Sequence, residues 1–79
     1  MRSRFVVRGL VQGVFFRATA QEKARELGLA RIQVWNRSDG AFECVAEGEA
    51  AQLASLEAWL HQGPAHARVE TVERKDEDP

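Results

Sequence analysis

Apolar and polar residues alternate in three stretches of the chain, as they do in β-strands that bury one face. Residues 4–9, RFVVRG, place Phe5 and Val7 together on one face. Residues 31–36 and 41–47 show the same period of two. The pattern predicts a half-buried strand in each stretch.

The segment between the second and third of these strands reads NRSDG, and its Asp39-Gly40 pair is a strong hairpin signal. We therefore expect these two strands to be antiparallel neighbours. Residues 67–74, ARVETVER, predict a last strand, in which Val69 and Val72 fall on opposite faces.

Two other stretches follow the helical period. Residues 16–27 repeat apolar side chains at helical spacing and end at Gly28, which favours a left-handed helix stop. Residues 50–62 do the same and end at Gly63-Pro64. The apolar stripe of this second predicted helix consists of Leu53, Leu56 and Leu60, widened by Trp59.

The predicted order is therefore βαββαβ. Two crossover helices around a central hairpin are typical of the ferredoxin-like α+β sandwich, an antiparallel sheet with two helices on one face. The first and third strands are expected at the centre of the sheet. We expect a single domain over residues 1–72, followed by a solvated acidic tail over 73–79, ERKDEDP.

Composition narrows the function classes. The 79 residues carry 11 basic and 12 acidic side chains, for a net charge of −1, which argues against a nucleic-acid partner. The single cysteine, Cys44, is expected in the core, with no metal site around it. No apolar run is as long as a membrane span or a signal peptide, so we expect a cytoplasmic protein without a membrane partner. We also expect a monomer.

The stretch GLVQGVFFR, residues 9–17, joins the first strand to the first helix. Gly9 and Gly13 allow backbone N–H groups to turn toward one point, and the start of a helix carries partial positive charge. Arg17 adds a planar fork of donors that suits phosphate or carboxylate. On spacing alone, an anion site and a tight turn with a solvated Arg17 both remain open.

These residues resemble a family signature, G-x-V-Q-G-V-x-F-R, that of the acylphosphatases. The matching positions are Gly9, Val11, Gln12, Gly13, Val14, Phe16 and Arg17. A second signature of that family is matched by Val34, Asn36, Asp39, Gly40, Glu43 and Gly48. The resemblance extends over roughly residues 4–72.

The resemblance implies an enzyme that hydrolyses the carboxyl–phosphate bond of small acyl phosphates to carboxylate and inorganic phosphate, with no metal or other cofactor. Arg17 and Asn36 are the implied catalytic residues: Arg17 binds the phosphoryl group, and Asn36 orients the attacking water. The implied phosphate-binding loop consists of Gly9, Leu10, Val11, Gln12, Gly13 and Val14. Inorganic phosphate or sulfate would compete for this loop.

One departure from the family pattern keeps an alternative open. Between Leu27 and Asn36 this chain has an additional residue, which we expect in the helix–strand loop, where insertions cost little. A bulge within the strand would instead turn Asn36 away and leave a non-catalytic phosphate-binding or regulatory module. A third reading, an RNA-binding domain, requires aromatic side chains on the open sheet face, whereas Phe5 and Phe42 are assigned to the core.

Overall fold

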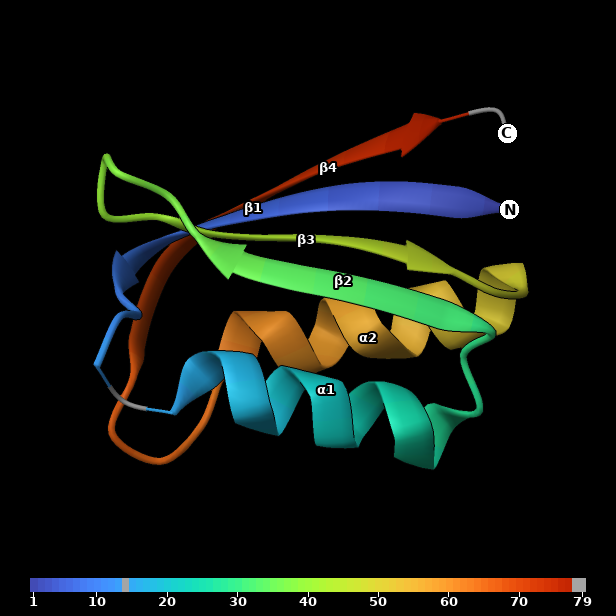
Figure 1. Ribbon diagram of the computed structural model, residues 1–79, viewed down its shortest axis with the longest axis horizontal. Helices are drawn as coiled ribbons and strands as arrows, with labels where there is room; N and C mark the ends of the chain where they lie inside the picture. Colours follow the sequence, from blue (N-terminus) through green and yellow to red (C-terminus); the bar gives the residue numbers. More distant parts are fainter. Residues whose placement is uncertain (14, 78–79) are drawn as a thin grey trace.

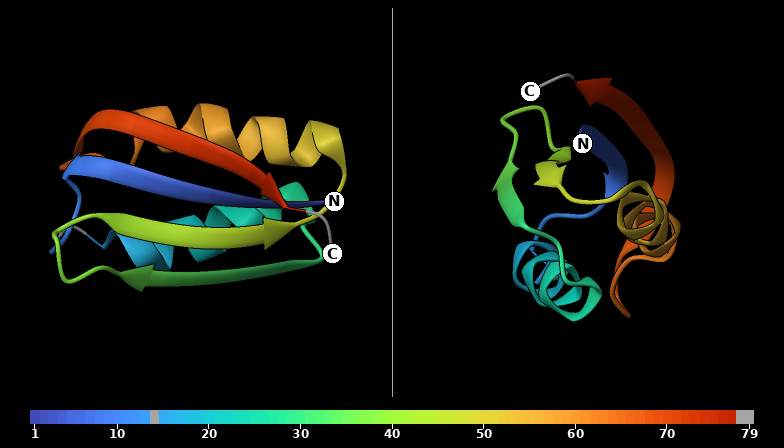
Figure 2. Two further views of the ribbon diagram at one scale, coloured as in Figure 1. Left: turned by 90° about the horizontal axis from the view of Figure 1, so that it is seen from above. Right: turned by 90° about the vertical axis from the view of Figure 1, so that its right-hand side faces the viewer.

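The computed structural model describes residues 1–13 and 15–77. Their strands form one four-stranded antiparallel sheet. The strands lie in the order β2-β3-β1-β4, and both helices cover one face of the sheet (Figures 1 and 2). The predicted βαββαβ ferredoxin-like sandwich is confirmed, with β1 and β3 at the centre. The elements are β1 (Arg2–Leu10), α1 (Phe16–Leu27), β2 (Arg31–Asn36), β3 (Phe42–Glu47), α2 (Ala50–Gln62) and β4 (Arg68–Glu77).

Both helices have the predicted bounds, and their ends have local causes. α1 ends at Gly28, whose left-handed backbone (φ 75°) lets its N–H donate to the carbonyl of Arg25 at 3.1 Å. α2 begins at a capping box, in which Gln52 Oε1 accepts a hydrogen bond from the N–H of Glu49 at 2.8 Å. None of the helices in the described residues is long and apolar enough to cross a bilayer.

The core fills the space between the sheet and the helices. Phe5, Phe42 and Cys44 are fully buried, as predicted. The ring of Phe16 at the start of α1 lies 4.7 Å from that of Phe42 and 5.7 Å from that of Trp59, centroid to centroid. The start of α1 is therefore fixed against both the sheet and α2 by aromatic packing.

The prediction of a solvated tail from residue 73 is wrong, because β4 continues to Glu77. Residues 73–77 pair with residues 2–6 of β1. The acidic residues that suggested a tail bind partners on β1: Ser3 Oγ donates to Asp76 at 2.6 Å, and Arg4 Nε donates to Glu77 at 2.9 Å. Residues 78 and 79 of the predicted tail lie outside the described residues.

These contacts lower the pKa of the side-chain carboxyl groups of Asp76 and Glu77 below their ordinary values. For Asp76 the main cause is the hydrogen bond from Ser3, followed by that from Arg74. For Glu77 the main cause is the hydrogen bond from Arg4. The ionised forms are thus the ones that the end of the sheet stabilises.

The prediction that Val69 and Val72 face opposite sides of the sheet is also wrong. The pairing register shifts between Arg8, which lies opposite Thr71, and Gly9, which lies opposite Val69. β4 therefore has an extra residue at this point, a β-bulge, and both valines pack against the core.

Gly9 is required at the bulge because the backbones approach closely there. Its φ is 134°, and a Cβ at this position would lie 2.1 Å from the carbonyl oxygen of Arg68. Only glycine fits without moving β4.

The additional residue before Asn36 does not form a bulge. β2 pairs with β3 in continuous register, from Arg31 opposite Glu47 to Asn36 opposite Phe42. The alternative of a bulge that turns Asn36 away is therefore absent from β2, and the strand delivers Asn36 in regular alternation.

Candidate active site

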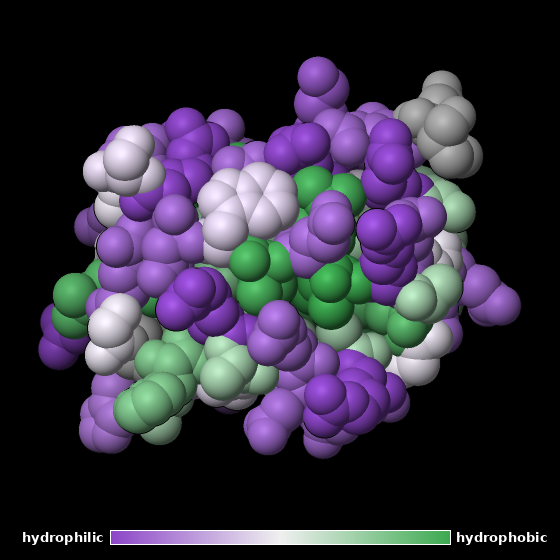
Figure 3. All heavy atoms as spheres, in the orientation of Figure 1, coloured by the Kyte–Doolittle hydropathy of each residue, from purple (hydrophilic) through white to green (hydrophobic). Residues whose placement is uncertain are grey.

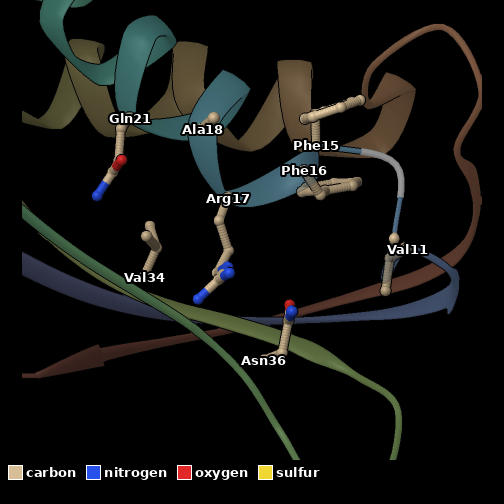
Figure 4. A pocket seen from close by; sticks show the side chains of 9 residues that line it. Val11, Phe15, Phe16, Arg17, Ala18, Gln21, Val34 and Asn36 are labelled. Carbon is tan, nitrogen blue, oxygen red and sulfur yellow. The ribbon is translucent and has the colours of Figure 1, made fainter.

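Arg17 and Asn36 line one cavity of about 430 Å³ between α1 and β2. Arg17 lies in the first turn of α1 and Asn36 is the last residue of β2. Ile32 and Val34 of β2 pack on the helix-facing side of the sheet, and Asn36 follows them on the same face. Figure 4 shows the side chains of Arg17 and Asn36 pointing toward one another across this space.

The N-terminus of α1 has no side-chain cap among the described residues, and no acidic residue lies in its first turn. Its N-cap, Phe15, has a left-handed backbone with φ 60°. α2, by contrast, is capped by Glu49 and Gln52. The first turn of α1, with its N–H groups and positive dipole end, therefore lines the cavity without a side-chain cap from the described residues, an arrangement that suits an anion.

The loop before α1 is shaped by Gly13 and tied down by Gln12. Gly13 has a φ of 76°, with no atom within 4 Å of the position where a Cβ would lie. Gln12 Nε2 donates to two backbone carbonyls of the β2–β3 turn, those of Arg37 at 2.9 Å and Ala41 at 3.2 Å. This side chain joins the loop to the segment that directly follows Asn36.

The residues of the predicted phosphate-binding loop lie in two different settings. Gly9 and Leu10 lie within β1 and pair with Val69 and Arg68 of β4. Val11 is buried in the core. Both Val11 and Gly13 line the cavity. The remaining predicted loop residue, Val14, lies outside the described residues.

The charge of Arg17 is available for a ligand. In the part of the chain that the structure describes, no acidic side chain forms an ion pair with Arg17, and none lines the cavity. Arg8 and Arg37, in contrast, both pair with Asp39, at 3.3 and 3.1 Å. The electrostatics of the cavity thus favour a negatively charged group beside Arg17.

Cys44, the single cysteine, does not belong to the cavity. It is fully buried on β3, and burial raises the pKa of its thiol to about 12. Within residues 1–13 and 15–77, no three His, Cys, Asp or Glu side chains gather in a metal-binding arrangement.

Sequence reasoning missed two contributions to this site. The side chain of Gln12 was assigned no role, because only its backbone N–H was considered. Gln21 lines the cavity one helical turn after Arg17. The i, i+4 spacing of these two residues is the signal that could have identified Gln21.

Comparison with known proteins settles the family. The family model described as Acylphosphatase matches residues 3–79. The chain belongs to the acylphosphatase family. An acylphosphatase from Xanthomonas oryzae pv. oryzae (strain MAFF 311018) is 54% identical over 72 residues, which cover 91% of this chain and 81% of that relative.

Two solved acylphosphatase structures have the same fold. The acylphosphatase from Coxiella burnetii matches with a TM-score of 0.89 at 42% identity, over 94% of this chain and 77% of that one. The acylphosphatase from Bacillus subtilis has a TM-score of 0.89 at 35% identity, over 94% of this chain and 81% of that one. The chain is a hydrolase of this family.

Proposed function

We propose that the chain hydrolyses acyl phosphates by direct attack of a water molecule on phosphorus, with the phosphoryl group bound by Arg17 and loop N–H groups and the water oriented by Asn36. The observation that carries this proposal is that Arg17 and Asn36, from different elements, line one cavity beside the uncapped end of α1.

Binding of the phosphoryl group would use three features of the α1 end of the cavity. The free N–H groups of the first helical turn donate hydrogen bonds, and Gly13 allows the loop to approach the ligand closely. Arg17 adds a fork of charged donors. Together these groups stabilise charge on the phosphoryl oxygens as the bond to the leaving group lengthens.

Asn36 would act on the water. Its side chain is exposed to the cavity at the end of β2, and the amide can both accept and donate hydrogen bonds. The oxygen of the water forms a bond to phosphorus, the bond between phosphorus and the carboxyl oxygen breaks, and the electron pair leaves with the carboxylate. One proton of the water passes to an oxygen of the newly formed phosphate, and the other stays on the water oxygen, now bound to phosphorus. Because a carboxylate is a good leaving group, positioning replaces a strong general base.

The same lining predicts selectivity against phosphate monoesters. An alkoxide is a poor leaving group and needs a proton from a general acid. The described residues of the cavity wall include no Asp, Glu, His, Lys or Cys. We therefore expect acyl phosphates to turn over and simple phosphate monoesters to remain intact.

Turnover of benzoyl phosphate in isotopically labelled water tests the proposal. We expect hydrolysis that resists EDTA, is competitively inhibited by phosphate or sulfate, and places the label in phosphate rather than in benzoate. Label in benzoate would contradict attack on phosphorus. Binding of phosphate to a folded protein without turnover would instead support the non-catalytic binding module.

A further inference from the structure

We propose that the acyl group of the substrate lies in a groove between α1 and β2, and that Arg25 at the far end of this groove selects acyl chains with a terminal anionic group. The inference rests on the proposed function, because the groove begins at the cavity in which Arg17 would hold the phosphoryl group. The substrate class is an acyl phosphate whose extended, apolar chain ends in an ω-carboxylate.

The groove would join the active-site cavity to a second cavity that shares a lining residue with it. A second cavity, of about 380 Å³, lies between the same two elements, and Gln21 lines both. Arg17, Gln21 and Arg25 follow one another at intervals of four residues, so they lie along one face of α1. A ligand anchored at Arg17 therefore has a path past Gln21 toward Arg25.

The length of this path follows from helix and strand geometry. Eight residues separate Arg17 from Arg25, a rise of about 12 Å along α1. On the opposite wall, Asn36 and Ile32 are four residues apart on β2, or about 13 Å. The groove is therefore longer than a phosphoryl group with a small acyl substituent, and it matches a chain of several methylenes.

The walls suit an apolar chain. Val34 lines the first cavity, and Ala24, Leu29 and Ile32 line the second. Figure 3 shows hydrophobic residues coming to the surface in the middle of this face, where β2 lies above α1. Methylenes placed there leave water for an apolar surface, a favourable transfer.

Arg25 places a cation at the far end. It is exposed in the last turn of α1 and lines the second cavity, together with the exposed Arg31 at the start of β2. No ion pair joins it to an acidic residue among those described, whereas Lys23 on the same helix pairs with Glu26 at 3.9 Å. A terminal carboxylate at this point would find a charged donor fork.

Matched substrate pairs test the charge preference. Adipoyl and hexanoyl monophosphate, and suberoyl and octanoyl monophosphate, differ only in the terminal carboxylate. For the wild type we expect kcat/KM to be about two- to fivefold higher for the carboxylated member at low salt, since exposed ion pairs are worth little. High salt should reduce the ratio. In Arg25→Gln the ratio should fall, and in the double variant Arg25→Gln/Arg31→Gln it should reach one, while kcat/KM for hexanoyl phosphate stays unchanged.

Arg68→Gln is the matched control, because it removes the same charge from an exposed position on β4, and it should leave the ratio unchanged. Ala30→Trp tests the groove itself, because Ala30 is exposed and lines the second cavity but not the first: octanoyl phosphate should lose about tenfold in kcat/KM, with acetyl phosphate spared. Wild-type ratios of one for both pairs would overturn the charge preference, and equal turnover of octanoyl phosphate by wild type and Ala30→Trp would overturn the groove. In both cases continued hydrolysis of benzoyl phosphate would leave the proposed function intact.

Discussion

Replacing Gln12 by alanine removes both hydrogen bonds that tie the loop before α1 to the β2–β3 turn. The carbonyls of Arg37 and Ala41 would lose donors at 2.9 and 3.2 Å, in a partly buried setting. At about 0.5–1.5 kcal/mol each, the loss in the free energy of unfolding is about 1–3 kcal/mol. The loop would also lose its fixed distance from Asn36, and a displacement of about 1 Å costs about 10² in kcat/KM.

Urea unfolding and benzoyl phosphate turnover of Gln12→Ala measure these two effects. With an m-value near the low end for small domains, about 1 kcal/mol/M, the urea midpoint should fall by about 1–3 M. Gln62→Ala is the control, because this glutamine is exposed at the end of α2, and it should change stability by less than about 0.5 kcal/mol. An unchanged midpoint together with unchanged kcat/KM for Gln12→Ala would refute the tether.

Two further predictions concern the sheet. Gly9→Ala should lower the free energy of unfolding by about 2–4 kcal/mol in denaturant titrations, since its Cβ would meet the carbonyl oxygen of Arg68; Gly13→Ala, which is strained but sterically open, should cost less. The lowered pKa values of Asp76 and Glu77 mean that their contribution to stability is complete at neutral pH and is lost as the pH falls through the folded-state values. Asp76→Asn should be less stable than wild type at pH 7 and lose less on acidification; an identical acid dependence would contradict the assignment.

The sequence predicted the helices well because their boundaries have strong local signals. The bounds of α1 and α2 agree with the apolar period and the following glycines, Gly28 and Gly63. Each helix ends where its own backbone turns left-handed or loses its apolar stripe.

The end of β4 could not be predicted because its partners lie on a distant strand. A run of acidic residues normally indicates a solvated end, and only the arginines and Ser3 of β1 make residues 73–77 part of the sheet. The bulge opposite Gly9 likewise depends on the contact with β4. Alternation alone therefore misplaced one of the two valines of this strand.

For the site, the sequence supplied Arg17 and Asn36 but not the contact that relates their segments. The bond from Gln12 to the β2–β3 turn joins residues 25 and 29 positions apart. Such a contact has no local sequence pattern. The placement of Asn36 also depended on whether β2 contains a bulge, which the continuous β2–β3 register excludes.

The central claim is that Arg17 binds the phosphoryl group and Asn36 orients the water. The most direct measurement is kcat for benzoyl phosphate together with the inhibition constant for phosphate, in wild type, Asn36→Ala and Arg17→Ala, with folding verified for each. Gln33→Ala, an exposed change on the opposite face of β2, serves as control. Asn36→Ala should lose about 10²–10³ in kcat with an unchanged phosphate inhibition constant. Arg17→Ala should lose both turnover and inhibition by phosphate. Near-normal kcat in Asn36→Ala would contradict the account.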